Sequence, residues 1–160
     1  MRYNMDKTNV MRILDQKKIR YTPYTYDSSI VEGTVIAATL GEKEEHVFKT
    51  LVTVSGTGTN FVFVIPVAET LDLKKAAKAV NVKSISMIKQ KELLPLTGYI
   101  HGGCSPIGMK KAFTTVIDES ADSLDFIYVS AGKVGYQVML DPHELAPLVR
   151  AKFAQLTAGK

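Results

Sequence analysis

Residues 46–66 decide the fold, and they read HVFKTLVTVSGTGTNFVFVIP. The two outer parts, His46–Val54 and Phe61–Pro66, are rich in valine, phenylalanine, leucine and threonine, which favour β-strands. Between them, the tract Gly56-Thr57-Gly58-Thr59-Asn60 supplies residues that tolerate a positive φ angle and let the chain reverse. This stretch predicts an antiparallel hairpin, the strongest hairpin signal in the chain.

Helices and shorter strands are predicted on both sides of this hairpin. Apolar residues at helical spacing predict helices over Asp6–Ile19, Thr34–Leu40 and Asp72–Val80. Thr8 or Asp6 can cap the first helix, and Gly41 can end the second in the left-handed conformation. Runs of β-branched and aromatic residues predict further strands at Tyr21–Tyr26, Ser84–Ile88, Ala112–Asp118, Phe126–Ser130 and Gly135–Leu140. Pro23 suits a sheet edge because proline cannot donate to a ladder, and Glu42–Glu45 is expected to be a solvated turn.

The end of the chain predicts a final helix. Asp141 is placed to cap it, and Pro142 occupies the first helical position, where proline is favoured. Pro147 removes a backbone donor, so either the helix kinks there or its regular part begins there. Apolar residues at helical spacing form its expected buried stripe: Leu145, Val149, Phe153 and Leu156.

Together these elements predict an α+β domain with a curved, largely antiparallel, barrel-like sheet flanked by helices. A length of 160 residues, 46% of them apolar, suits one domain over residues 1–160 with a core of its own. Apolar runs fall well short of the roughly 20 residues that cross a bilayer. The polar start Met1–Asn4 precedes no apolar segment. We therefore expect a soluble, cytoplasmic protein with no membrane partner.

Cysteine and histidine offer little for metal or disulfide chemistry. The single cysteine, Cys104, excludes an intramolecular disulfide, and the three scattered histidines give no zinc-ligand spacing. We expect no metal and no cofactor. His46 and His143 are interpreted as surface or capping residues.

The formal charge of +4 is concentrated in one segment. Between Leu71 and Lys111 there are eight lysines against two acids, a net +6, so the rest of the chain carries −2. The lysines are Lys74, Lys75, Lys78, Lys83, Lys89, Lys91, Lys110 and Lys111. A lysine-rich face is either ordinary solvated surface or a footprint for phosphate groups, and charge alone does not decide between them.

The most unusual stretch is GYIHGGCSPIG at residues 98–108, with four glycines and a proline. Glycines at this density let backbone amides approach an anion or a developing oxyanion; the alternative is a long connection that needs tight turns. The loop lacks the spacing of a Walker A or Rossmann motif. His101 and Cys104 allow a thiol-hydrolase interpretation, whereas a small buried filler is the plainer role for Cys104.

Lys49 stands inside an apolar strand pattern, where alternation places it on one face with Val47 and Leu51. An unpaired ammonium is costly there. Either its stem extends along a sheet edge to water, or the lysine projects into a polar pocket and meets a phosphate, carboxylate or carbonyl. The second glycine turn, residues 129–133, is either a plain hairpin turn or a source of free amides and a hydroxyl.

Three segments together resemble the YbaK/EbsC family of aminoacyl-tRNA deacylases. They are FKTL at residues 48–51, GYIHGGCSPIGMKK at residues 98–111 and IYVSAGK at residues 127–133. Residues 71–78 and 141–153 are also similar, so the resemblance covers nearly the whole chain. It implies a mixed α/β barrel-like domain related to the editing domain of bacterial-type prolyl-tRNA synthetases.

The resemblance also implies the site residues. Lys49 would be the pocket lysine, and Tyr26 would line the pocket. A Gly-x-x-x-Pro loop would hold the aminoacyl end; it contains Gly102, Gly103, Ser105 and Pro106. Ser130 and Gly132 would form the opposite rim of the pocket. The chain departs from relatives at Glu32, where they have an aromatic residue, at Ala131 (glycine), at Val134 (basic), and at His101 and Cys104 (aliphatic).

The activity implied is trans-editing: hydrolysis of Cys-tRNA(Pro), with Cys-tRNA(Cys) also a substrate. The family mechanism is substrate-assisted, since the cysteinyl thiol attacks its own ester and the protein supplies positioning and amide donors from the two glycine turns. Alternatives are an Ala-tRNA(Pro) deacylase of the same superfamily, or a non-catalytic module that binds tRNA 3′ ends or a synthetase. Prolyl-tRNA synthetase is the expected protein partner, and the tRNA is expected to lie along Lys74, Lys75, Lys78, Lys110 and Lys111.

Overall fold

The computed structural model describes residues 7–29, 32–41 and 44–159. Helices within these ranges are α1 (Asn9–Gln16), α2 (Gly33–Leu40), α3 (Leu73–Ala79), α4 (Leu93–Thr97) and α5 (Pro142–Leu148). Strands are β1 (Thr22–Thr25), β2 (Phe48–Ser55), β3 (Asn60–Pro66), β4 (Ile85–Met87), β5 (Thr114–Asp118), β6 (Ile127–Ser130), β7 (Tyr136–Leu140) and β8 (Lys152–Ala154). Short 3-10 turns occupy Glu44–His46, Gln90–Glu92 and Glu119–Ser123. None of the helices in the described part of the chain is long and apolar enough to cross a membrane.

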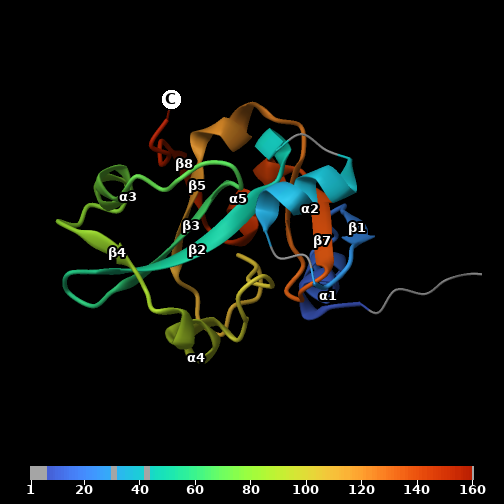
Figure 1. Ribbon diagram of the computed structural model, residues 1–160, viewed down its shortest axis with the longest axis horizontal. Coiled ribbons are helices and arrows are strands. Elements are labelled where there is room, and N and C mark those ends of the chain that lie inside the picture. The colour runs from blue at the N-terminus through green and yellow to red at the C-terminus, as the bar shows by residue number, and fades with distance from the viewer. Residues whose placement is uncertain (1–6, 30–31, 42–43, 160) are drawn as a thin grey trace, which may run out of the picture.

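The strands are divided between two sheets (Figure 1). One sheet has the order β4-β2-β3-β5-β8 and the other β1-β7-β6, so β1, with Pro23, is an edge strand as predicted. A parallel bridge between Val47 and Tyr128 joins the two sheets. Most pairings are antiparallel, whereas β3 with β5 and β5 with β8 are parallel. The α+β class and the largely antiparallel pairing are confirmed, with the strands in two linked sheets rather than one.

The predicted hairpin is confirmed as β2 and β3, in a register that pairs Lys49 with Ile65 and Val54 with Asn60. Gly58 takes a φ of 89° at its tip, and the amide of Ser55 donates to the Thr59 carbonyl at 2.8 Å. Every residue of β3 after Asn60 is buried, because β3 lies inside the larger sheet between β2 and β5. The hairpin is therefore the rigid element from which Lys49 projects.

Helix ends follow the predicted caps. The Thr8 hydroxyl accepts from the amide of Met11 at 3.3 Å, and Gly41 ends α2 with a φ of 74°. Asp72 accepts from the amides of Lys74 and Lys75 and so fixes the start of α3. Asp6, the alternative first cap, and residues 42–43 of the expected turn lie outside the described residues.

The predicted length of the final helix is wrong. Asp141 caps α5 as expected, with its carboxylate 2.8 Å from the His143 amide, and Pro147 lies in the last turn. The chain then turns at Arg150, whose φ is 56°, and forms β8. The side chains of the expected stripe do pack inward, and Leu156 is fully buried, but parallel pairing of β8 with β5 replaces further helical turns.

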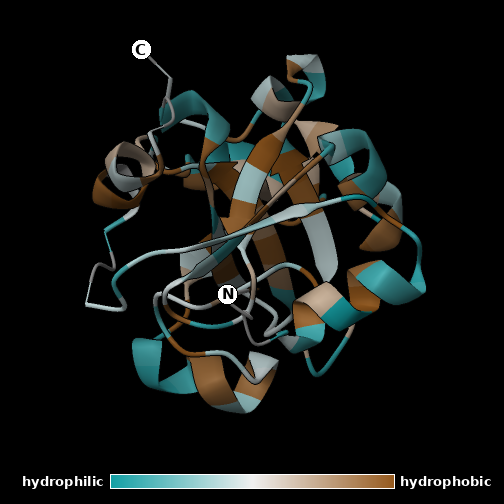
Figure 2. Cartoon of the chain, turned by 90° about the vertical axis from the view of Figure 1, so that its right-hand side faces the viewer, coloured by the Kyte–Doolittle hydropathy of each residue, from teal (hydrophilic) through white to brown (hydrophobic). Residues whose placement is uncertain are grey.

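Buried apolar side chains form three clusters. The largest lies among α1, β6, β7 and α5, and a second lies between the larger sheet and α3. The third, here called the sheet junction, comprises Ala37, Val47, Val67 and Tyr128. Figure 2 shows hydrophobic colouring gathered on the central strands and hydrophilic colouring on outer helical turns. The sheet junction holds the two sheets together beside the cavity described next.

Candidate functional site

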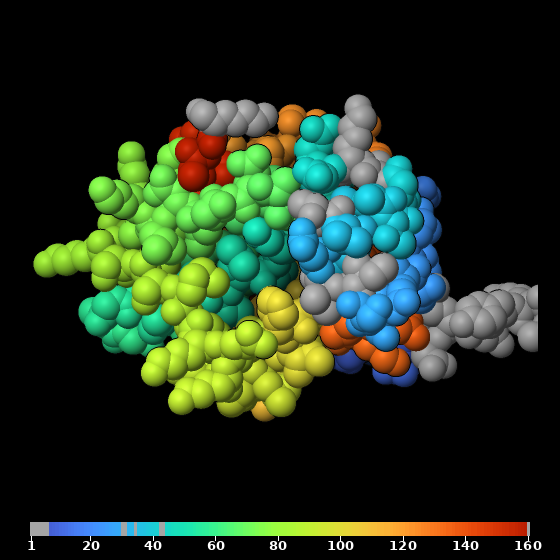
Figure 3. Space-filling view, in the orientation of Figure 1, coloured from blue at the N-terminus to red at the C-terminus, as the bar shows by residue number. Residues whose placement is uncertain are grey.

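A cavity of about 450 Å³ opens beside the sheet junction. Figure 3 shows the surface hollowed between β2, in teal, and the glycine loop near residue 100, in yellow. Elements distant in sequence thus meet around one space. The residues that line it are Glu32, Gly33, Ile36, Val47, Phe48, Lys49, Thr50, Leu51, Val67, Leu93, His101, Gly102, Cys104, Ser130 and Gln137.

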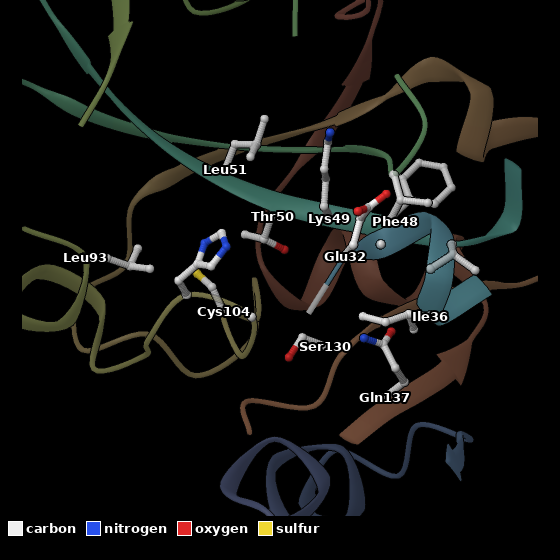
Figure 4. A pocket seen from close by; sticks show the side chains of 15 residues that line it. Glu32, Ile36, Phe48, Lys49, Thr50, Leu51, Leu93, Cys104, Ser130 and Gln137 are labelled. Carbon is white, nitrogen blue, oxygen red and sulfur yellow. The ribbon is translucent and has the colours of Figure 1, made fainter. Parts of the chain in front are cut away.

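Lys49 projects from β2 at this cavity (Figure 4). Lys49 and Leu51 lie on one side of the strand and Thr50 on the other, as alternation predicts. Burial lowers the pKa of Lys49 from its ordinary value, while the carboxylate of Glu69 raises it. A half-buried ammonium interacts with a carbonyl or phosphate oxygen more strongly than one in bulk water, because less solvent screens the charge.

The two glycine-containing turns pack directly against each other. A Cβ added to Gly103 would lie 3.0 Å from the backbone nitrogen of Val134 and 3.2 Å from the carbonyl carbon of Lys133. Gly132, with a φ of 90°, has a similarly close approach to Tyr99 and Val10. Gly102 and Ser130 line the cavity, whereas Gly103 and Gly132 are absent from its lining and pack against neighbouring segments.

Most of the amides expected to face an oxyanion already donate within the protein. The Gly103 amide donates to the Ile100 carbonyl at 3.0 Å, and the Ala131 amide donates to the Tyr136 carbonyl at 3.0 Å. The Gly132 amide donates to the Ser130 hydroxyl at 3.2 Å. The expectation that both turns supply several amide donors is therefore wrong for these three, and Gly102 is the cavity-lining glycine of the first turn that remains.

Three further predicted residues do not line the cavity. Ser105 is fully buried, and its hydroxyl accepts from the Ile107 amide at 3.2 Å, so it shapes the loop from within. Pro106 is also buried. The Tyr26 amide donates to the Gly135 carbonyl at 2.9 Å, while its hydroxyl is buried without a partner among the described residues.

Gln137 and Thr50 are cavity residues that the sequence analysis missed. Gln137 is only 4% exposed, and its side-chain oxygen and the Thr50 hydroxyl are buried without hydrogen-bond partners in the described part of the chain. A buried polar atom normally has a partner, so a ligand that carries donors would satisfy them. The signal for Gln137 was the one used for Lys49, a polar residue within an apolar strand.

Cys104 lines the cavity but is unsuited to act as a nucleophile. Burial raises the pKa of its thiol to about 12, although a hydrogen bond with the Thr97 side chain lowers it. The thiolate is the reactive form, and at neutral pH it is almost absent here. Among the described residues, no three histidine, cysteine or acidic side chains group closely enough to hold a metal ion.

The lysines proposed to contact tRNA lie outside the cavity lining. Lys74, Lys75 and Lys78 belong to α3, which lies across the β2–β3 hairpin from α4 (Figure 1). The Lys75 ammonium donates to the Thr157 carbonyl at 2.8 Å, so it also anchors the end of the chain. Lys110 and Lys111 are exposed after the glycine loop.

Comparison with known proteins identifies the family. The family model described as the aminoacyl-tRNA editing domain matches residues 29–148, which contain every residue that lines the cavity. The chain belongs to the aminoacyl-tRNA editing domain family. The predicted resemblance is thereby confirmed.

Individual relatives agree with this assignment. A protein of Enterococcus faecalis named "Putative Cys-tRNA(Pro)/Cys-tRNA(Cys) deacylase EbsC" is 44% identical over 94% of this chain and 93% of its own length. Two solved structures share the fold at 22% identity. The "putative trans-editing enzyme for prolyl tRNA synthetase" has a TM-score of 0.82 and covers 96% of this chain and 100% of its own. The "hypothetical protein APE2540" has a TM-score of 0.85 and covers 92% and 98%.

Proposed function

We propose that this protein is a trans-editing enzyme that hydrolyses the ester of misacylated tRNA, with Cys-tRNA(Pro) as its main substrate and Cys-tRNA(Cys) as a second. The relative named as a deacylase of these two substrates supports this substrate class. The observation that carries the proposal is the cavity itself. It combines a half-buried lysine with glycine turns, and its own thiol has a pKa of about 12.

A cavity of this kind suits a substrate that brings its own nucleophile. The sulfur of the cysteinyl group attacks the ester carbonyl carbon, a C–S bond forms, and the C–O bond to the terminal ribose breaks. The leaving ribose oxygen takes up the proton that the thiol loses. Water then adds to the resulting thiolactone and opens it to free cysteine, so the net reaction is hydrolysis.

The protein contributes position and charge to these steps. Lys49 belongs to the cavity lining and carries a partly desolvated ammonium, which would stabilise the negative charge that develops on the carbonyl oxygen. The amide of Gly102, which also lines the cavity, is the backbone group proposed to assist it. A preorganised donor of this type contributes about 3 kcal/mol to transition-state stabilisation. Gln137 and Thr50, with unpartnered buried oxygens, would accept from the substrate's thiol or ammonium.

The test is a panel of purified Cys-tRNA(Pro), Ala-tRNA(Pro) and Ser-tRNA(Pro) incubated with the protein, with and without prolyl-tRNA synthetase. We expect release of cysteine only. Hydrolysis of Ala-tRNA(Pro) alone would reassign the substrate, and salt-sensitive tRNA binding without turnover would make the protein a binding module.

Two variants test the assignment of the site. Loss of a hydrogen bond from a charged group costs about 1.5–3 kcal/mol, so Lys49→Met should lower kcat/KM for Cys-tRNA(Pro) by about 10- to 100-fold. Cys104→Ala should leave kcat/KM unchanged. The opposite pattern would restore the thiol-hydrolase interpretation.

A further inference from the structure

The walls of the cavity carry very few charged side chains. Among the described residues that line it, Glu32 is the one carboxylate and Lys49 the one ammonium, with His101 as the only other ionisable nitrogen. The remaining lining residues are apolar, neutral polar or the Cys104 thiol. A charged ligand group would therefore be directed to Glu32 or to Lys49 by the sign of its charge.

Glu32 is held at the rim by the start of α2. Its carbonyl accepts from the Ile36 amide at 3.0 Å, and its side chain does not cap the helix. The next residue, Gly33, approaches so closely that an added Cβ would lie 2.6 Å from the side chain of Val67. This contact fixes the backbone next to Glu32, and Figure 4 shows the carboxylate on the same side of the cavity as Phe48 and Lys49.

An aminoacyl ester carries groups that complement the charges of these two side chains. The ester has no carboxylate, since its carbonyl is bonded to ribose, and its free α-amino group carries a positive charge below a pKa of about 7.7–8.0. Lys49 repels that ammonium and attracts the carbonyl oxygen, whereas Glu32 attracts the ammonium. We propose that Glu32 is a specificity-determining residue that binds the free α-ammonium of the aminoacyl ester. This inference rests on the proposed function of the cavity.

The consequence is a rule about substrates. Aminoacyl-tRNA with a free amine has the charge that Glu32 recognises, whereas esters blocked at nitrogen, such as peptidyl-tRNA, lack it. Selection of this kind would restrict hydrolysis to unblocked aminoacyl esters, independently of the amino-acid side chain.

The experiment compares Cys-tRNA(Pro) with N-acetyl-Cys-tRNA(Pro), which keeps the thiol and the ester but has no ammonium. Initial rates of deacylation are measured at pH 6.5, where the α-amino group is charged, for the unmodified protein and for Glu32→Gln, Glu32→Asp and Glu44→Gln. Glu44 is an exposed acid outside this cavity and serves as the matched control.

For the unmodified protein we expect kcat/KM to be about tenfold higher for the free amine, as for one charge-assisted hydrogen bond. Glu32→Gln should abolish this preference by lowering kcat/KM for Cys-tRNA(Pro) alone, through KM. Glu32→Asp should retain part of it, and Glu44→Gln should retain all of it. An equal loss of activity on both substrates in Glu32→Gln, or no preference in the unmodified protein, would overturn the inference. Absence of all deacylation by the unmodified protein would instead refute the proposed function.

Discussion

The close contact between the two glycine turns gives a sharp prediction for Gly103→Ala. The new Cβ would meet the Val134 nitrogen at 3.0 Å and the Lys133 carbonyl carbon at 3.2 Å, and these backbone atoms cannot rotate away. Ordinary carbon contacts begin near 3.5 Å, so the loop must move by about half an ångström. Because a shift of about 1 Å can cost 100-fold in rate, we expect kcat/KM for Cys-tRNA(Pro) to fall about tenfold. Overpacking should also cost about 1–3 kcal/mol of unfolding free energy.

Gly56→Ala is the matched control. Gly103 and Gly56 both lack a positive φ angle, so alanine causes no backbone strain at either site. At Gly56 the new Cβ would meet the Ser84 hydroxyl oxygen at 2.8 Å, and that side chain can change rotamer. Deacylation kinetics and urea denaturation of both variants provide the measurements. Full activity in Gly103→Ala would show that the contact between the two turns does not position the glycine loop at the cavity.

Two further predictions concern other parts of the surface. The His143 imidazole lies 2.9 Å from the carboxylates of both Asp122 and Asp141, and hydrogen bonds to Asp122 and then Asp141 raise its pKa. A raised pKa stabilises the folded protein fully below the ordinary histidine pKa of about 6.5, and this stabilisation is lost as pH rises through the pKa of the folded state. In His143→Gln, the free energy of unfolding measured with urea should therefore change less between these two pH values. An unchanged pH profile would contradict this prediction. Neutralising Lys74, Lys75 and Lys78 of α3 together should weaken tRNA binding and reduce its salt dependence. Filter binding at several salt concentrations measures both. An unchanged salt slope would show that this face is ordinary solvated surface.

Local signals predicted much of this fold. The β2–β3 hairpin, the Thr8, Asp72 and Asp141 caps and the Gly41 helix end depend on residues a few positions apart, so their chemistry is visible in the sequence. The final helix was predicted too long because β8 is specified by β5, more than 30 residues earlier. Helical periodicity and burial in a strand both place apolar residues inside, so the pattern alone could not separate them.

The same distinction applies to the candidate site. Lys49 was identified because a charge inside an apolar strand is costly, and the glycine loop because its composition is unusual. Gln137 carried the same kind of signal more weakly, since an uncharged amide is less costly to bury than an ammonium. Glu32 reaches the cavity only because α2 packs on Val67, a contact between segments that no local pattern encodes. The amides of Gly103 and Gly132, by contrast, are engaged by partners three and two residues away, so these local bonds were missed although no long-range contact forms them.

Selectivity in this site must come from chemistry more than from size. A cavity of about 450 Å³ has room for alanyl and seryl groups as well as cysteinyl, and a pocket rejects a smaller side chain or a near-isostere only weakly. Serine differs from cysteine mainly in the nucleophile it offers, and a hydroxyl is far less acidic than a thiol, whose pKa is about 8.5. Since the cavity's own thiol is held neutral by burial, a substrate that lacks a competent nucleophile can bind and leave intact. In the proposed mechanism, the raised pKa of the Cys104 thiol would leave discrimination to the sulfur of the substrate.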